Sequence, residues 1–500
     1  MPAQITSLSS LAFFAPELIL TGTVAALLVA DLLVKGSPSR KRILSVVAVA
    51  GLVLAGLALR GLCCTGPQGL FGGMVALDSM AVFFKAFFVL VGLFGVLFAL
   101  LSAEVDEVRL GEYLALMVCL VLAMSLLGSA SNLLMIYLSL EFVSIPSYVL
   151  SGFRKGDRVG SEAALKYVIY GAVASGVMLY GLSLLYGLAG TLDLAALNAR
   201  VTALAASPAG LGTLLVALVL TMAGFLYKIA AVPFHMWCPD VYQGAPTPFT
   251  AFLSVGPKAA GFAALIRFFH VAFISGGEGA AAGLPWPEMF GVVSMATMTL
   301  ANLVALTQTN VKRLLAWSSV AHAGYLLMGF SLASTQGAHA ILLYLGLYLL
   351  MNLGAFLSVI AVRDATGSEE LSAYRGLASR SPVVAVSLAL FLFSLTGVPP
   401  LAGFIGKFYV FAAVLSHGGP FYYALAFVGV VNSVVSLYYY AMVVRAMFLD
   451  AAPEGAGKMP VRAGASALLL VLAVPTVVLG VYWKPLSDLA SASLTLYMGP

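Results

Sequence analysis

Four ionisable residues lie deep inside apolar stretches of this 500-residue chain: Glu141, Lys228, Lys258 and Lys407. Only 9% of the residues are charged and 62% are hydrophobic, so a charge in the middle of an apolar stretch is not incidental. In a membrane helix a central lysine costs about 2.5–3.5 kcal/mol on insertion scales, and such residues usually face the protein interior and mark a path for ions or protons. The four residues are therefore candidate sites of proton transfer.

A carboxylate and several amines in an apolar surrounding can pass protons when the distance between them changes. Burial disfavours the ammonium form of a lysine and a nearby carboxylate favours it, so a lysine held between these influences can gain and lose a proton near neutral pH. Movement of Glu141 would then switch a lysine between holding and releasing its proton. The alternatives are a neutral Glu141 hydrogen-bonded between helices, a fixed ion pair, or lysines that extend to the membrane surface. The last alternative suits Lys85 and Lys166, which lie nearer the ends of their stretches.

Other polar residues could extend a hydrated path between the lysines. His322 is the strongest candidate, because an imidazole can both accept and donate a proton. Any one of the others is equally well explained as a hydrogen bond between helices: His235, Ser318, Ser319, Tyr325, Asn302 and Asn352. The pair Lys312–Arg313 is interpreted as an anchor that fixes the membrane topology. Tyr438–Tyr440 are interpreted as part of an interfacial aromatic belt or as packing residues.

The sequence contains no motif for covalent chemistry or for a metal. The four cysteines (Cys63, Cys64, Cys119 and Cys238) lack the spacing of metal ligands. There is no phosphate-binding glycine loop, dinucleotide fingerprint, haem-type ligand pair or nucleophile–base arrangement. The formal net charge of +5 is small, which does not indicate a nucleic-acid partner. We therefore expect the chain itself to bind no metal or cofactor.

The apolar stretches predict an all-α polytopic membrane protein. Stretches of about 20 apolar residues are long enough to cross the hydrocarbon core of a bilayer as helices. Mean hydropathy is +1.05 over the whole chain, and the loops leave no room for a separate catalytic domain. About fourteen transmembrane helices are expected, with the approximate limits 11–34, 43–60, 77–101, 111–128, 131–153, 162–189, 210–233, 248–272, 287–306, 313–332, 337–362, 383–415, 421–447 and 463–482.

The distribution of basic residues supports this count. The loops that follow odd-numbered helices hold most of the lysines and arginines, whereas the other loops and the tail hold only Arg60, Arg200 and Lys484. Loops on the cytoplasmic side of a membrane carry an excess of Lys and Arg. The pattern therefore predicts an even number of helices with both termini on the outer side. A miscount of one helix in the middle of the chain would invert half of the pattern.

Two stretches cannot be simple helices. Residues 383–415 would form a helix of roughly 50 Å at 1.5 Å per residue, and they contain Pro399–Pro400, where the helix should break. The stretch around Lys228 runs into Pro233 and predicts a second break. Each broken helix is the fourth in a set of five, and an odd number of helices places two such sets in opposite orientations, an arrangement that marks transport sites. The expected units are 1–110 with helices 1–3, repeats at 111–274 and 287–450, and 451–500 with helix 14.

Three long motifs resemble the proton-pumping membrane subunits of respiratory complex I, NADH-quinone oxidoreductase. They are GFLYKIAAVPFHMWCPDVYQGAPTPFTAFLSVGPKAAGF at 224–262, NVKRLLAWSSVAHAGY at 310–325 and SLTGVPPLAGFIGKFYVF at 394–411. The similarity covers most of the chain, and it is best to the N type of these subunits. Subunits of multisubunit cation/proton antiporters belong to the same family. Gln243 stands where a glutamate is usual, and Pro257, where a small polar residue is common, predicts local unwinding beside Lys258.

The resemblance implies a role for each buried charge. Glu141 and Lys228 match the family's ion pair between the fifth and seventh helices, Lys258 its central lysine and Lys407 its terminal lysine. NADH, FMN, iron–sulfur clusters and quinone are implied in partner subunits, which would be other antiporter-like and small membrane subunits and a hydrophilic redox arm. The location implied is the bacterial inner (plasma) membrane, with both termini periplasmic.

The predicted function is proton translocation by a membrane subunit of NADH-quinone oxidoreductase, driven by redox chemistry in partner subunits. An alternative is a subunit of a multisubunit Na⁺(K⁺)/H⁺ antiporter, which would use the same residues. A third is a passive membrane scaffold whose buried charges only hold helices together. The scaffold is disfavoured because Lys228, Lys258 and Lys407 cannot all be paired by Glu141.

Overall fold

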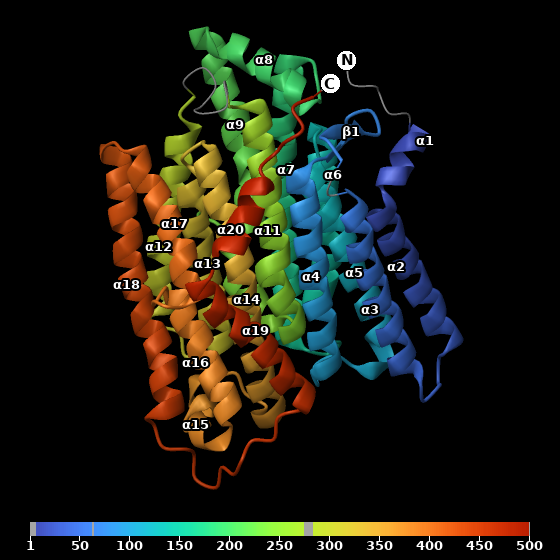
Figure 1. Cartoon of the computed structure of the whole chain (residues 1–500), viewed down its shortest axis with the longest axis vertical. Coiled ribbons are helices and arrows are strands. Elements are labelled where there is room, and N and C mark those ends of the chain that lie inside the picture. The colour runs from blue at the N-terminus through green and yellow to red at the C-terminus, as the bar shows by residue number, and fades with distance from the viewer. Residues whose placement is uncertain (1–6, 63–64, 275–283, 500) are drawn as a thin grey trace.

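The computed structural model describes residues 7–62, 65–274 and 284–499, and Figure 1 shows long helices packed side by side through the height of the molecule. Cys63 and Cys64 lie outside the described residues. The first helices are α1 (Ser7–Ser10), α2 (Ala15–Leu33), α3 (Arg40–Leu59), α4 (Ser79–Leu101), α5 (Leu110–Ser129), α6 (Leu133–Ser151), α7 (Arg158–Ala189), α8 (Leu194–Ala205) and α9 (Pro208–Ile229). The later helices are α10 (Trp237–Gly244), α11 (Thr247–Ala272), α12 (Trp286–Ala305), α13 (Val311–Phe330), α14 (Thr335–Thr366), α15 (Leu377–Arg380), α16 (Pro382–Thr396), α17 (Ala402–His417), α18 (Pro420–Phe448), α19 (Ala463–Val481) and α20 (Lys484–Ala492).

Short elements complete the described chain. Strands β1 (Gln68–Leu70) and β2 (Val75–Leu77) form an antiparallel hairpin before α4, which the hydropathy pattern did not predict. The remaining turns of helix are η1 (Leu11–Phe13), η2 (Arg60–Leu62), η3 (Glu107–Arg109) and η5 (Leu371–Tyr374).

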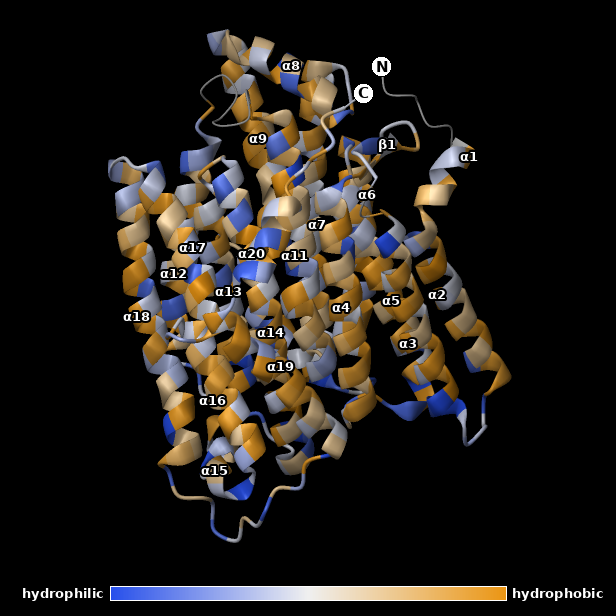
Figure 2. Ribbon diagram, viewed as in Figure 1, coloured by the Kyte–Doolittle hydropathy of each residue, from blue (hydrophilic) through white to orange (hydrophobic). Residues whose placement is uncertain are grey.

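The predicted number of membrane crossings is confirmed within the described residues. Twelve helices are long and apolar enough to cross a membrane. Two further crossings are made by α13 and by the pair α16 and α17. Apolar residues cover the helices along their length, while hydrophilic residues gather at the ends and at a few interior positions (Figure 2). The protein is therefore a multi-pass membrane protein.

Both predicted breaks are present. The first separates α9 from α10 and the second separates α16 from α17, and each lies in the fourth crossing of a set of five. A cis peptide bond precedes Pro233 in the first break and Pro400 in the second. Two details differ from the prediction: α9 ends at Ile229, before Pro233, and α11 continues through Pro257 without unwinding. One proline removes a single hydrogen bond from the helix, and neighbours surround α11 on all sides.

The two ends of the bundle differ in charge. The loops 34–39, 102–109, 152–157, 306–310, 367–381 and 449–462 lie together at the lower end in Figure 1, and we call this end the basic face. The start of the described chain and its C-terminal residues both lie at the opposite end. This arrangement agrees with the even number of crossings predicted from the charges.

Ion pairs tie the loops of the basic face together. Glu104 is buried and pairs with Arg154 at 3.2 Å and with Arg363 at 3.0 Å. Arg363 also pairs with Glu369, which in turn binds the fully buried Lys312 at 3.1 Å. Lys312 is thus more than the topology anchor that the sequence indicated: it is part of an internal network.

Lys166 joins the same face in a different way. Its ammonium pairs with Glu162 at 2.7 Å and with Asp240 of α10 at 2.6 Å, and Arg313 also pairs with Asp240 at 2.6 Å. Burial opposes ionisation of Asp240, but the hydrogen bonds from Lys166 and Arg313 hold its pKa below the ordinary value. The short helix α10 is therefore fixed to α7 and α13 by charge.

Two buried ion pairs hold the N-terminal helices against the rest of the bundle. Lys85 of α4 pairs with Glu17 of α2 at 2.7 Å, and both side chains are almost completely buried. The prediction that Lys85 extends to the membrane surface is therefore wrong. Arg267 of α11 pairs with Asp78 at 2.6 Å, and Asp78 also accepts hydrogen bonds from the backbone of Ala81 and of Tyr497 near the C-terminus. Sequence reasoning missed this second pair.

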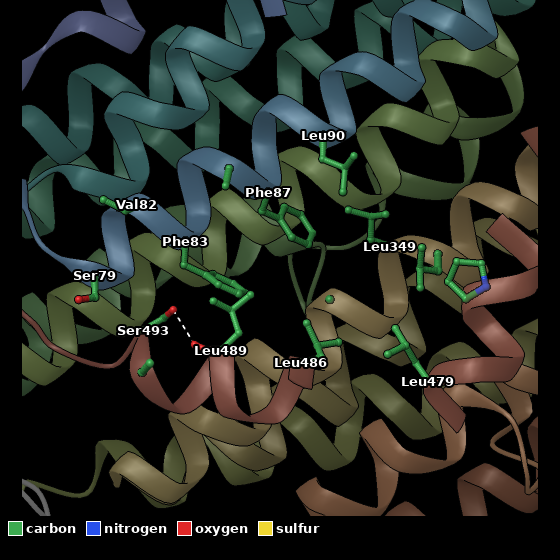
Figure 3. Close-up of a pocket in the computed structure, with 15 residues that line it drawn as sticks. Ser79, Val82, Phe83, Phe87, Leu90, Leu349, Leu479, Leu486, Leu489 and Ser493 are labelled. Carbon is green, nitrogen blue, oxygen red and sulfur yellow. Dashed lines mark hydrogen bonds between the residues drawn. The ribbon is translucent and has the colours of Figure 1, made fainter. Parts of the chain in front are cut away.

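A hollow of about 530 Å³ opens between α4, α14, α19 and α20 (Figure 3). Its walls are apolar side chains such as Phe87, Leu349 and Leu486, with the hydroxyl groups of Ser79 and Ser493 at one end. No ionisable residue lines it in the part of the chain that the structure describes. The hollow is therefore separate from the candidate proton-transfer residues.

The Asp78–Arg267 pair yields a first prediction. Asp78→Asn keeps a good N-cap for α4 but leaves the Arg267 guanidinium buried without an anion, which costs about 3–5 kcal/mol. We expect the melting temperature of the purified protein in detergent to fall. The exposed pair Lys41–Glu107 supplies the control, because Glu107→Gln should leave the melting temperature unchanged. Replacing both Asp78 and Arg267 by apolar residues should be less harmful than Asp78→Asn, and an unshifted melting temperature for Asp78→Asn would contradict the assignment.

Candidate functional site

Lys228 lies in the last turn of α9, next to the first break. Its side chain is 3% exposed, and its Nζ donates a hydrogen bond of 2.6 Å to Ser144 Oγ on α6. The helix ends at Ile229, one residue later, because Ala230 adopts a left-handed conformation with φ +59°. A Cβ added at Gly261 of α11 would lie 3.2 Å from Lys228 Cγ, so this glycine allows the lysine stem to pass directly against α11. Gly261 is one turn from Lys258, which brings the two lysines into neighbouring positions.

Glu141 lies near the middle of α6 and is only partly buried. Its Oε1 is inaccessible to solvent, and among the described residues this atom has no hydrogen-bond partner. No cation of the described residues lies within 4 Å of the Glu141 carboxylate. The implied Glu141–Lys228 contact is therefore absent from this structure. Ser144, one helical turn from Glu141, takes the contact with Lys228 instead.

Lys258 lies in the middle of α11, which is buried along its whole length. Its Nζ donates hydrogen bonds to the carbonyl oxygen of Ser319 and, at 2.5 Å, to Ser319 Oγ on α13. The Tyr348 hydroxyl on α14 donates to the same Oγ at 3.0 Å. One turn along α11, Ser254 accepts a hydrogen bond of 2.6 Å from Asn352. Lys258 therefore meets neutral oxygen atoms from α13, which α14 supports.

His322 lies at the centre of a group of hydroxyl groups. Its Nδ1 shares a hydrogen bond of 2.7 Å with the Tyr344 hydroxyl, and its Nε2 shares one of 3.4 Å with the Tyr440 hydroxyl. Tyr440 also shares a hydrogen bond of 2.5 Å with Ser318. Tyr440 is fully buried, which matches the packing alternative for the tyrosine cluster, whereas Tyr438 is 65% exposed, as a place in an interfacial belt requires.

Lys407 lies in α17 just after the second break, and the break itself supplies its partners. Its Nζ donates to the carbonyl oxygen of Thr396 at 2.7 Å and to Ser433 Oγ at 2.9 Å. Thr396 is the last residue of α16, so its carbonyl group has no partner within the helix. The Tyr325 ring lies 4.5 Å from Nζ in a cation–π contact. Gly397 has φ +94°, and a Cβ there would lie 2.9 Å from Lys407 Cδ, so this position requires glycine.

The structure brings most of the predicted residues together. The His322 ring lies 5.1 Å from the Tyr348 ring and 5.9 Å from the Tyr325 ring, so it stands between the surroundings of Lys258 and those of Lys407. His235 is buried in the first break, against Trp317 at 5.7 Å between ring centroids.

Asn302 belongs to a different contact. It bonds Asn432 at 3.2 Å and Tyr439 at 3.0 Å, which matches the alternative of an interhelical hydrogen bond.

Sequence reasoning missed the neutral partners of the amines. Serines and tyrosines are common in membrane helices, and only the four-residue spacing of Tyr344 and Tyr348, which places both on one face of α14, could have indicated them. The missed residues are Ser144, Thr396, Ser433, Tyr344, Tyr348 and Tyr440.

The arrangement suits storage and transfer of protons. Within the described residues, no group of three or more His, Cys, Asp and Glu side chains could hold a metal ion. The amines of Lys228, Lys258 and Lys407 instead have hydroxyl or carbonyl oxygen atoms as their direct partners. Such oxygen atoms accept hydrogen bonds from an ammonium or from a neutral amine, so neither form is locked in place.

Comparison with known proteins agrees with this arrangement. The family model described as "NADH:quinone oxidoreductase/Mrp antiporter, TM" matches residues 130–436. The chain is 50% identical to NADH-quinone oxidoreductase subunit N of Anaeromyxobacter sp. (strain Fw109-5), with 100% of this chain and 99% of the relative covered. It is 48% identical to NADH-quinone oxidoreductase subunit N 2 of Sorangium cellulosum, with 99% of each covered.

A solved structure of respiratory complex I from Thermus thermophilus with bound aureothin contains a chain of the same fold. It superposes with a TM-score of 0.77 at 32% identity, over 95% of this chain and 99% of that chain. Full-length coverage, the two broken crossings and the buried amines lead to one conclusion: this chain belongs to the subunit N family of NADH-quinone oxidoreductases.

Proposed function

We propose that Glu141, Lys228, Lys258, His322 and Lys407 form a proton relay through this membrane subunit of NADH-quinone oxidoreductase. The observation that carries the proposal is that three lysines buried at membrane depth have neutral oxygen atoms, and no carboxylate, as direct partners among the described residues. An amine used only to hold helices together would be expected to carry a counter-ion, as Lys85 does with Glu17.

The contacts support an order for the relay. Lys228 stands beside α11, one turn from Lys258. From Lys258 the polar groups continue through Ser319 and Tyr348 to His322. The Tyr325 ring lies against both His322 and Lys407, so these two groups are neighbours, and this completes the sequence Lys228, Lys258, His322, Lys407.

Small rearrangements are sufficient to drive such a relay. Moving one proton against 100 mV requires about 2.3 kcal/mol, and a tenfold change in proton affinity corresponds to about 1.4 kcal/mol. A change of roughly fiftyfold in the affinity of one amine therefore balances the work. Glu141 has an unpartnered buried oxygen and no ion pair, so it is free to approach or leave Lys228 as neighbouring subunits move.

The rest of the assembly follows from the same proposal. Residues 111–274 and 287–450 act as two inverted units, with 1–110 and 451–500 packed around them. NADH, FMN, iron–sulfur clusters and quinone bind to partner subunits, which include other membrane subunits and a hydrophilic redox arm. The basic face lies toward the cytoplasm of a bacterium, and both termini lie on the periplasmic side of the inner membrane.

The antiporter alternative receives no specific support. The two relatives of 50% and 48% identity are both subunits of NADH-quinone oxidoreductases. The structure also disfavours the passive scaffold. Charges that only hold helices together should be paired with counter-ions, whereas Lys228, Lys258 and Lys407 have neutral oxygen atoms as partners among the described residues.

The relay predicts the effect of removing its amines. Lys228→Ala or Lys407→Ala should slow proton passage through this subunit by about a hundredfold or more, as expected when a positioned proton-transfer group is lost. In proteoliposomes containing the assembled complex, the number of protons pumped per NADH oxidised should fall. The exposed Lys484 is a matched control, and Lys484→Ala should pump normally. Undiminished pumping by both relay variants would refute the relay.

A substitution at Lys258 distinguishes the relay hypothesis from the scaffold hypothesis. Lys258→Met keeps the length of the side chain and removes its charge. We expect the complex to assemble normally on a native gel and to pump fewer protons. Loss of assembly, with normal pumping by the complexes that do form, would support the scaffold instead.

Replacing the cations of the assay buffer distinguishes the proton relay from a Na⁺(K⁺)/H⁺ exchange function. Replacing Na⁺ and K⁺ by choline in the proteoliposome assay should leave NADH-driven acidification unchanged. A strict requirement for Na⁺ or K⁺ would support the antiporter function.

A further inference from the structure

The amine of Lys228 rests on a hydroxyl group one turn away from its implied carboxylate partner. Lys228 Nζ donates to Ser144 Oγ at 2.6 Å, while Glu141, three residues earlier on α6, has an unpartnered Oε1. Residues three apart on a helix lie about 5–6 Å apart between Cβ atoms. The amine can therefore pass between the two partners by a change of side-chain rotamer.

Ser144 begins a row of serines that leads toward the basic face. Ser144, Ser147 and Ser151 are spaced by three and four residues, so they lie on one stripe of α6, and all three are fully buried. Arg154 follows three residues after Ser151, in the loop of the basic face, and its guanidinium pairs with Glu104. The row therefore joins the position of Lys228 to the charged network of the basic face.

The hydroxyl groups of the row are oriented alike. Each donates to the carbonyl oxygen four residues earlier: Ser144 to Leu140 at 2.8 Å, Ser147 to Val143 at 2.6 Å and Ser151 to Ser147 at 2.8 Å. This local bond is common for serine within helices, and it accounts for the hydroxyl hydrogens only. The oxygen lone pairs stay available to accept hydrogen bonds, and Ser144 uses one for Lys228.

We propose that Ser144 is a further relay residue, which holds the Lys228 amine when Glu141 withdraws and passes protons to it along the row from Ser151 and Ser147. The proposal deepens the proton-relay function above and rests on it. In each step a hydroxyl oxygen takes a proton from the side of the basic face and gives its own proton to the next group, so every serine ends neutral. At the end of the row a neutral Lys228 amine becomes an ammonium.

The gaps along the row are of a size that water bridges. Neighbouring serines on the stripe are separated by about 5–6 Å between Cβ atoms, and one bridging water is nearly as favourable as a direct hydrogen bond. Tyr148 lies on the same helix one residue from Ser147, and its hydroxyl group accepts a hydrogen bond of 3.5 Å from the Tyr227 hydroxyl. The surroundings of the serines are thus polar enough to hold such water.

The test compares Ser144→Ala with two matched variants in the assembled complex. Ser144→Ala should reduce protons pumped through this subunit by about tenfold or more, because a hydrogen bond to a charged group is lost. Ser144→Thr keeps the hydroxyl group and should restore pumping. Ser139→Ala is the control: Ser139 is buried on the same helix and its hydroxyl group has no hydrogen-bond partner among the described residues, so pumping should not change.

The outcomes distinguish this inference from the relay itself. Lys228→Ala is measured in the same preparation. If Lys228→Ala impairs pumping and Ser144→Ala does not, the role of Ser144 is overturned while the relay stands. If Lys228→Ala pumps normally, the proton relay itself is refuted, and the role of Ser144, which rests on it, is refuted with it. A defect in Ser144→Ala that Ser144→Thr does not repair also overturns the proposal, since it would trace the effect to packing.

Discussion

The central constraint on this protein is the presence of amines where water is scarce. An ammonium group at membrane depth must find oxygen atoms to accept its hydrogen bonds, or lose its proton. The fold supplies those oxygen atoms from two sources, the hydroxyl groups of serine and backbone carbonyl groups. Lys407 uses both, because Ser433 and the terminal carbonyl of α16 converge on its Nζ. The second helix break thus provides one of the acceptors that permit a charge at this depth.

The buried charges fall into two chemically distinct groups. Glu17–Lys85 and Asp78–Arg267 are closed ion pairs, in which each charge is neutralised by a direct partner, and they attach the N-terminal helices and the C-terminal segment to the bundle. A closed pair leaves neither charge without a partner, so it suits a structural role. The lysines of the proposed relay, Lys228, Lys258 and Lys407, instead contact neutral oxygen atoms. Because these partners carry no charge, a movement of Glu141 would change the electrostatic environment of an amine, and this is the basis of the proposed proton transfer.

The two helices at the centre of the bundle keep these groups in place. α11 carries Lys258 and is wholly buried, and α14 carries Tyr344 and Tyr348 and is buried over most of its length. Neither helix has a face toward the lipid that would allow it to shift alone. Ser319 and His322 of α13 are therefore held between fixed partners, whereas Glu141 lies on the partly exposed α6, where the proposed relay requires it to move.

The sequence by itself determined the number of crossings, the two breaks and the identity of the buried amines. Hydropathy, proline and charge act on local stretches of chain, so they can be read without knowledge of packing. Local signals could not assign Lys85 to Glu17, place Tyr440 beside His322, or show that Lys228 rests on Ser144. Each of these contacts joins segments far apart in the chain, 118 residues in the case of His322 and Tyr440. Only the packing of the helices decided which hydroxyl groups reach each amine, because many serines and tyrosines in the sequence could have served equally well.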